Sequence, residues 1–445
     1  MNYFSCVFFL LKSAFFAMLL FLAGASVAQT DMTDAAPLNV RIGPAQTTVG
    51  FQPCEPSIAI SLKNPDIVIA GSILDNVYRS TDGGYTWEHN TLTSPYGVYG
   101  DPCVVASPNG DFYYLHLSNP EGKGWESEML LDRIVCQHSK SKGKRWSKGG
   151  SIGQDHPKDQ DKEWAVVSLD GERIHACWTQ FDKYASQEPT DSTIILCSFA
   201  GRKGENWSDP IRVSEKAGDC LDDDETTEGA VPSVGPNGEI YVAWALDETI
   251  WFDRSFDQGK TWMAHDIAAA DIVGGWAQTV DAIGRVNGMP VTGVDLSPES
   301  PYNGRIYINW TDARNGSNDL DVFVCYSDDN GTTWSSPIRV NNDEAGSQQF
   351  FTWMAVDPVS GGIHVVFYDR RAHDDATTDV YVASSNDGAL TWTNRLVSES
   401  SFLPQGEVFF GDYNNISAFD GHVRPIWTRE VNGVLTIMTA ILEVE

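Results

Sequence analysis

The chain has 445 residues, of which 61 are acidic and 30 are basic, so its formal net charge is −31. A negative field of this size opposes binding to DNA, RNA and anionic membranes, and it favours solubility in salty surroundings or the binding of cations. We therefore expect a soluble protein that has no nucleic-acid partner and does not insert into a membrane.

The first 28 residues have the pattern of a secretory signal peptide. Lys12 is their one charged side chain, an apolar run covers residues 13–27, and the segment ends in Ser26-Val27-Ala28. The run is short for a membrane span, although the weakly basic start leaves an uncleaved anchor open. We expect residues 1–28 to be removed, residues 29–37 to form a short linker, and the protein to be secreted or periplasmic.

Of the eight cysteines, Cys6 lies in the leader and seven remain. Their odd number and the lack of a C-x-x-C pair argue against a disulfide framework or a zinc site. Cys177 and Cys197 fall on segments that we expect to be neighbouring strands, so this pair could form a disulfide. The other cysteines are expected to be small buried hydrophobic residues.

A short Gly- and Asp-rich turn closed by tryptophan recurs six times. The closing residues are Trp87, Trp146, Trp207, Trp262, Trp334 and Trp392. The best copies share the pattern S-x-D-x-G-x-T-W, in which the Asp accepts backbone N–H bonds, the Gly takes a positive φ and the Trp packs between sheets. These Trp turns predict an array of one repeated unit in which the Asp residues are structural.

Between the Trp turns, β-hairpins recur in which β-branched and aromatic residues alternate. Aligning both elements predicts seven inner strands, which start near Glu55, Asp101, Glu163, Ala230, Pro290, Thr352 and Asp412. The seventh unit lacks a fourth strand, and residues 38–42 can supply it. We therefore predict an all-β, seven-bladed propeller of four-stranded antiparallel blades over residues 38–445, closed by an N-terminal strand, with six blades as the alternative.

The Trp turns resemble the Asp-box, or bacterial neuraminidase repeat, of the sialidase superfamily, and the resemblance covers nearly the whole mature chain. Retaining sialidases use a Tyr nucleophile helped by a Glu, an acid/base Asp and three Arg that hold the sialate carboxylate. This chain departs from that pattern because it has seven units instead of six, and its segment 41–44 only echoes the early Arg-Ile-Pro signature. Tyr413 with Glu407 is the best available pair.

The loops that enter the inner strands carry acidic residues. Those expected at one axial mouth are Glu55, Asp101, Asp161, Glu228 and Asp412. Such crowding would raise some pKa values or recruit a cation, whereas the structural alternative is that each carboxylate caps its own strand. We take Asp101, Asp161 and Glu163 as candidate catalytic acids, and Trp164 as a substrate contact.

Four arginines follow three of the inner hairpins, at Arg314, Arg370, Arg371 and Arg429. They could clamp a substrate carboxylate or sulfate. Alternatively, each could pair with a nearby Asp, which the repetition of Asp-x-Arg favours.

Two further groups remain open. His156, with Tyr184 on a neighbouring loop, could serve the β-elimination of a uronate polysaccharide, although a lone loop His is more often solvated. Asp222, Asp223 and Asp224 could bind Ca²⁺, although such runs are usually solvated acidic loops.

The leading hypothesis is an exported propeller that acts on glycans as an exo-sialidase-type glycoside hydrolase at the axial mouth. The alternatives are a lyase acting on a uronate polysaccharide and a non-catalytic module that binds a glycan or a protein. An enzyme should gather a perturbed acid, a nucleophile or base and at least two unpaired Arg in one pocket. We expect no required cofactor and a monomeric protein.

Overall fold

The computed structural model describes residues 37–43 and 51–444. The predicted leader, residues 1–28, and the predicted linker up to residue 36 lie outside the described residues. Within the described ranges the one helical element is the 3-10 turn η1 (Gly124–Glu126), and no helix has the length and apolar character that crossing a bilayer requires.

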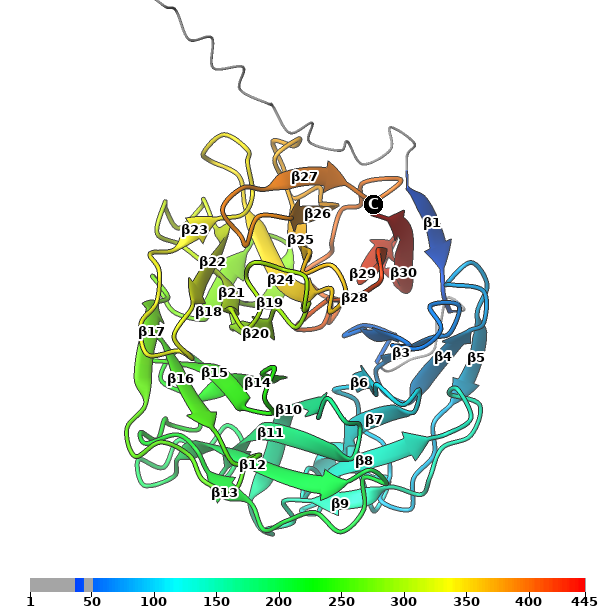
Figure 1. Ribbon diagram of the computed structural model, residues 1–445, viewed down its shortest axis with the longest axis vertical. Helices are drawn as coiled ribbons and strands as arrows, with labels where there is room; N and C mark the ends of the chain where they lie inside the picture. The colour runs from blue at the N-terminus through cyan, green and yellow to red at the C-terminus, as the bar shows by residue number, and fades with distance from the viewer. Residues whose placement is uncertain (1–36, 44–50, 445) are drawn as a thin grey trace, which may run out of the picture. The chain divides into compact units, whose positions relative to one another are not determined.

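Seven four-stranded antiparallel sheets surround a common centre, which confirms the seven-bladed propeller (Figure 1). From inner to outer strand, the first blade contains β2 (Ser57–Ile60), β3 (Val68–Ser72), β4 (Asn76–Ser80) and β5 (Glu88–Thr91). The second contains β6 (Cys103–Ala106), β7 (Phe112–Leu117), β8 (Ile134–Ser139) and β9 (Gly150–Ile152). The third contains β10 (Asp159–Val167), β11 (Arg173–Phe181), β12 (Thr193–Gly201) and β13 (Ile211–Arg212).

The remaining blades follow the same order. The fourth contains β14 (Glu228–Val234), β15 (Ile240–Leu246), β16 (Thr249–Ser255) and β17 (Ile267–Asp271). The fifth contains β20 (Val291–Val294), β21 (Ile306–Asp312), β22 (Asp321–Ser327) and β23 (Ile338–Arg339). The sixth contains β24 (Gln349–Val356), β25 (Ile363–Asp369), β26 (Asp379–Ser385) and β27 (Thr393–Leu396).

The seventh blade combines both ends of the described chain. It contains β28 (Asn415–Phe419), β29 (His422–Val431), β30 (Val434–Glu443) and β1 (Leu38–Arg41). The outer strand β1 pairs with β30 in a register that sets Leu38 opposite Ile441.

A two-stranded hairpin, β18 (Ala277–Val280) and β19 (Ile283–Asn287), is inserted between the fourth and fifth blades. Arg370 holds its turn, because the guanidinium Nη2 donates to the carbonyl of Asp281 at 2.7 Å. Asn287 holds its end, since its amide donates to the carbonyl of Asp412 at 2.7 Å. The insertion is therefore tied to the sixth and seventh blades.

The Trp turns have the hydrogen bonds that their residues predict. In the fifth blade, Asp329 accepts the backbone N–H of Thr333 at 2.8 Å, its hydroxyl at 2.7 Å and the hydroxyl of Ser327 at 2.8 Å. Gly331 has a φ of 84° there, and Trp334 packs against Phe252 of the fourth blade with ring centroids 5.1 Å apart. These Asp residues therefore hold the scaffold, as predicted.

Five of the six Trp turns are also points at which neighbouring blades are joined, because a polar side chain of one blade donates to a carbonyl in the turn of the next. The pairs are Arg79 to Lys142, Tyr113 to Arg202, Arg254 to Asn330, Arg305 to Gly388 and Arg424 to Gly83. The last pair joins the seventh blade to the first at 2.7 Å. The contacts to Gly388 and Gly83 are buried, and a buried carbonyl without a donor would cost about 1–3 kcal/mol, so these two contacts stabilise the junctions of their blades.

The blades pack through apolar side chains, and tryptophans of the second strands are the largest fully buried residues. They are Trp178, Trp244, Trp310 and Trp427. Cys177 and Cys197 face each other on β11 and β12 and form a disulfide, as predicted. The five free cysteines of the described chain are all buried.

The pKa of Asp329 is lowered to about 2, first by the Thr333 hydroxyl and then by its backbone N–H. A lowered carboxyl pKa stabilises the fold above the unfolded pKa of about 3.9, and that contribution is lost as the pH falls towards 2. We expect Asp329→Ala to lower the free energy of unfolding by about 1–2 kcal/mol at pH 7 and by less at pH 2, measured by urea denaturation. Asp209→Ala, at an exposed position, is the control, and equal losses in both variants would contradict the structural role.

Candidate functional site

A hollow of about 210 Å³ opens at the side of the propeller where the inner strands begin, and we call it the axial mouth. Charged side chains from several blades line it, namely Glu55, Asp101, Asp161, Lys162, Arg285 and Asp412. Aromatic side chains line it as well, namely Phe51, Tyr99, Trp125, Tyr184 and Phe409. Four of the five carboxylates expected at one mouth are therefore together there, and two cations accompany them.

Left-handed backbone at the start of the inner strands aims these side chains. Glu55, Asp101 and Lys162 have φ values of 52°, 48° and 52°, which side chains other than glycine adopt at a cost of about 1–2 kcal/mol. In β10 the pairing register shifts between Asp161 and Trp164, which is the mark of a β-bulge. A bulge re-aims the side chains around it. The bulge explains why Lys162 lines the mouth whereas the next residue, Glu163, does not.

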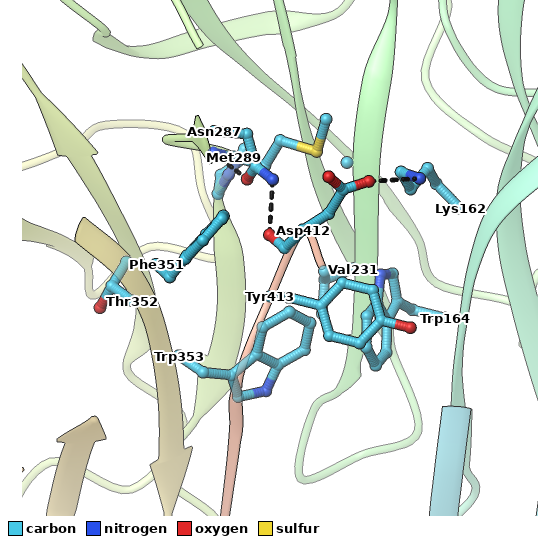
Figure 2. Close-up of a pocket in the computed structure, with 12 residues that line it drawn as sticks. Lys162, Trp164, Val231, Asn287, Met289, Phe351, Thr352, Trp353, Asp412 and Tyr413 are labelled. Atoms are coloured by element: carbon cyan, nitrogen blue, oxygen red, sulfur yellow. Dashed lines mark hydrogen bonds and ion pairs between the residues drawn. The ribbon is translucent and has the colours of Figure 1, made fainter. Parts of the chain in front are cut away.

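Lys162 is the central cation of the mouth. Its Nζ lies 3.1 Å from Asp412 Oδ2, 3.4 Å from Asp101 Oδ2 and 3.9 Å from Asp161 Oδ2, as Figure 2 shows for Asp412. Burial alone would lower the pKa of this ammonium, but Asp101, Asp161 and Asp412 hold it well above its usual value. Lys162 directly follows Asp161 in the chain, but the sequence does not indicate that three carboxylates would surround its ammonium group.

Arg285 is the second cation, and it comes from β19 of the inserted hairpin. Its Nε lies 2.9 Å from Asp412 Oδ1, and its Nη1 lies 2.6 Å from Asp222 Oδ2. The sequence analysis missed this residue. One signal was available, since the spacing of 72 residues between Trp262 and Trp334 is the longest between successive Trp turns and contains the insertion.

Tyr184 and Asp222 form a hydrogen-bonded pair beside Arg285. The phenol of Tyr184 donates to Asp222 Oδ2 at 2.5 Å, and Arg285 Nη1 lies 3.3 Å from the phenol oxygen. Burial, followed by the Asp222 charge, raises the pKa of Tyr184. Burial also raises the pKa of Asp222, while Arg285 and Lys162 oppose that rise. A phenol is thus held against a carboxylate that can accept its proton.

The surroundings shift the pKa values of the remaining carboxyls of the mouth in different directions. Burial, with the charges of Asp101 and Asp412, raises the pKa of Glu55 well above its usual value, whereas Lys162 and Arg285 outweigh burial and lower the pKa of Asp412. Burial raises the pKa of Asp161 to about 6, against the opposing charge of Lys162. The surroundings therefore shift the pKa values of these carboxyls in opposite directions, with that of Glu55 raised, that of Asp412 lowered and that of Asp161 at about 6.

Glu163, Trp164 and Tyr413 do not line the mouth, although Trp164 and Tyr413 line an adjoining pocket that shares Lys162 and Asp412 with it. Tyr413 packs on Trp164 and Trp353, with ring centroids 5.1 and 6.2 Å away, and the phenol has no hydrogen-bond partner among the described residues (Figure 2). Neither carboxyl oxygen of Glu163 has such a partner within the described chain, and burial raises its pKa well above the usual value. Glu407 is exposed and lies on the wall of a different hollow, so the expected Tyr413 and Glu407 pair is not brought together.

The four predicted arginines serve the scaffold. Arg314 pairs with Asp312 and Arg371 with Asp369 of their own loops, which confirms the structural alternative for these two. Arg370 holds the inserted hairpin, as described above. Arg429 pairs with Glu399 at 3.2 Å. Among the residues described, none of the four lines the axial mouth.

The other predicted residues are dispersed. His156 is exposed on its loop and lies apart from the residues that line the mouth. Asp223 accepts the N–H of Glu225, and Asp224 accepts that of Ala277 at 2.7 Å, while Asp222 binds Arg285. In the part of the chain that the structure describes, no group of three or more His, Cys, Asp or Glu side chains is arranged to hold a metal ion.

Glu228, the fifth carboxylate expected at the mouth, is completely buried on β14. Its carboxyl oxygens have no hydrogen-bond partner among the described residues, and burial raises its pKa well above the usual value. A neutral carboxylic acid at this position avoids the large penalty of a buried, unpaired charge.

No protein-family model matches the chain. Among solved structures, a protein of unknown function from Dyadobacter fermentans superposes with a TM-score of 0.50 at 14% identity, covering 77% of this chain and 94% of that one. At this identity the likeness concerns the fold alone. A Hadza microbial sialidase (TM-score 0.47, 13% identity, 85% and 75% coverage) and the NanB sialidase from Streptococcus pneumoniae (0.48, 10%, 85% and 83%) are more distant in structure.

The Lys162 ammonium should make the stability of the fold depend on pH. Without it, the folded-state pKa of Asp412 would rise above the unfolded value of about 3.9, so stability would be lost as the pH rises through that range. We expect Lys162→Met to lower the free energy of unfolding by about 3–5 kcal/mol at pH 8 and by clearly less at pH 4, measured by urea denaturation. Lys144→Met, at an exposed position, should change it little at either pH. A pH-independent loss in Lys162→Met would contradict this account.

Proposed function

We propose that this propeller is a glycoside hydrolase whose reaction takes place in the axial mouth. The observation that carries the proposal is the Tyr184 phenol, which donates to Asp222 at 2.5 Å beside Arg285 and in the same hollow as Asp161. A nucleophile, a carboxylate that can take its proton and a separate acid with a perturbed pKa are the parts that glycosidic cleavage requires.

Tyr184 acts as the nucleophile, and Asp222 acts as its general base. Asp222 accepts the phenol proton as the oxygen bonds to the anomeric carbon. Arg285 contacts both groups and favours the developing negative charge on the phenol oxygen.

Asp161 acts as the acid and then as the base. With a pKa of about 6 it still carries a proton in part of the molecules near neutral pH, and it can give that proton to the departing glycosidic oxygen. In the second half of the reaction it takes a proton from water, whose oxygen bonds to the anomeric carbon. The bond from that carbon to Tyr184 breaks as the water oxygen bonds, and Asp222 returns the proton to the phenol oxygen.

The proposed substrate is a neutral glycan instead of a sialoside. Sialate recognition requires unpaired arginines, but Arg285 is already bound to Asp222 and Asp412, and the four predicted arginines serve the scaffold. The carboxylates of the mouth would also repel an anionic sugar. The same repulsion disfavours elimination from a uronate, for which the exposed His156 offers no base at this hollow.

One observation favours a non-catalytic glycan-binding module as the second candidate. Both cations of the mouth are paired with protein carboxylates, as expected where charges only maintain the shape of a site. Binding without turnover by the unmodified protein would support this candidate over the hydrolase.

We expect Tyr184→Phe to lower kcat by at least about 10³-fold, because losses of this size or larger follow removal of a covalent nucleophile. The wild-type protein and the variant would be offered chromogenic glycosides of neutral sugars, a fluorogenic sialoside and uronate polysaccharides. Tyr85→Phe, at an exposed position in a Trp turn, is the matched control and should keep full activity. Undiminished activity in Tyr184→Phe would rule out Tyr184 as the nucleophile.

The raised pKa of Asp161 should determine how the hydrolysis rate depends on pH. Because the first step needs the protonated carboxyl, the rate of that step should fall as the pH rises through about 6. We expect kcat/KM to show this basic limb in the wild-type protein, and Asp161→Asn to remove the limb together with most of the rate. The comparison uses a substrate with a poor leaving group, since a nitrophenolate departs without acid help. A basic limb that persists in Asp161→Asn would assign the titration to another group.

A further inference from the structure

Exposed aromatic rings form a continuous arc along the axial mouth, and we call it the aromatic arc. It consists of Phe409, Phe51, Tyr99, Trp125 and Tyr184. Trp125 is 61% exposed, Phe51 45% and Phe409 42%. Apolar surface gathered at the rim of a hollow is a common mark of a binding site, because leaving it in water costs free energy.

The rings contact one another in sequence around the rim. Phe409 and Phe51 lie 6.1 Å apart between centroids, Phe51 and Tyr99 lie 6.3 Å apart, and Tyr99 and Trp125 lie 6.4 Å apart. The planes in these three pairs meet at 79–84°, so the rings touch edge to face. Each edge-to-face contact covers one face of one ring of the pair, so the remaining ring faces stay available to a ligand.

Trp125 lies next to the proposed nucleophile and is held in place. Its ring centroid is 5.4 Å from that of Tyr184. It occupies the 3-10 turn η1, whose entry is fixed by the N–H of Gly124 donating to Asn119 Oδ1 at 3.1 Å. The Ser127 hydroxyl, bound to Glu121 at 2.9 Å, fixes the exit. Because the platform is already ordered, a ligand that stacks on it loses little free energy in arranging it.

The chemistry of the mouth limits what can stack there. The arc offers ring faces, whereas the floor offers Asp161, Arg285 and other charged groups that need hydrogen-bond partners when water leaves. A purely apolar ligand would bury those groups unpaired. A sugar ring satisfies both surfaces, since its C–H faces are apolar and its hydroxyls form hydrogen bonds along its edge.

We infer that the aromatic arc is a set of sugar subsites, and that the substrate is an extended, neutral glycan chain instead of a single terminal sugar. This inference rests on the proposed function. Units on one side of the cleaved bond lie against Trp125, beside Tyr184, and the following units extend along Tyr99 towards Phe51 and Phe409. Chain length, and not one anionic group, is then the basis of recognition.

Binding of a size series tests the inference. Mono-, tri- and hexasaccharides built from glucose, xylose, mannose or arabinose would be titrated calorimetrically into Tyr184→Phe, so that binding is measured without turnover. We expect at least one hexasaccharide to bind about tenfold or more tightly than its monosaccharide, since each stacked ring adds a factor of several. Introducing Trp125→Ala into the same protein should remove most of that difference.

Phe256→Ala is the matched control, because Phe256 is also 61% exposed but lies in a Trp turn. It should leave the size series unchanged. Equal affinity for short and long sugars, an equal loss for both in the Trp125 variant, or binding of apolar peptides without any sugar would overturn the inference. If Tyr184→Phe still hydrolyses a glycan, Tyr184 is not the nucleophile. If the wild-type protein hydrolyses none of the glycans, the proposed function fails, while the size series still decides about the arc.

Discussion

The convergence of seven inner strands on one axis is the constraint on which the rest of the structure depends. Whatever side chains stand at the starts of those strands are brought together, whether or not they attract. In this chain several of them are carboxylates, and like charges at close range in a low-dielectric setting repel strongly. The fold is compatible with such a sequence only because Lys162 supplies an ammonium within reach of three carboxylates and Arg285 a guanidinium to a fourth. The positive charges of Lys162 and Arg285 therefore offset the repulsion between the carboxylates and hold them in place in the mouth.

The two ends of the blades have different tasks. The Trp turns are held by short-range hydrogen bonds and accept donors from the preceding blade, so they fix the angular order of the sheets. The starts of the inner strands contain left-handed residues and bulges, which are unfavourable locally but aim side chains. Backbone strain is tolerated where the surrounding scaffold determines it, and it gathers where side chains must be placed precisely. The hydrogen-bonded Trp turns thereby support the strained backbone at the starts of the inner strands.

Much of the fold was predictable because its signals are local and repeated. The S-x-D-x-G-x-T-W turns, the alternating hairpins and the pairing of Cys177 with Cys197 each follow from a few neighbouring residues. The gathering of carboxylates followed from counting seven units. The Tyr184 and Asp222 pair was not predictable, since the two residues lie on separate loops outside the repeat. The predicted pairing of Tyr413 with Glu407 failed, because Glu407 is exposed on the wall of another hollow whereas Tyr413 is buried against Trp164 and Trp353. Closeness in sequence does not reveal which way each of two side chains faces.

The contact between the seventh and first blades has a consequence for how the chain reaches its native state. The N–H of Ile58 donates to Asn415 Oδ1 at 3.3 Å and that of Ile60 to Ser417 Oγ at 3.0 Å, in both cases across a separation of 357 residues. The backbone N–H groups of Ile58 and Ile60 therefore lack these acceptors until residues 415 and 417 have been synthesised. Contacts so distant in sequence form late and make folding slow. The strands of the first blade are thus complete in sequence long before the ring of seven blades can close.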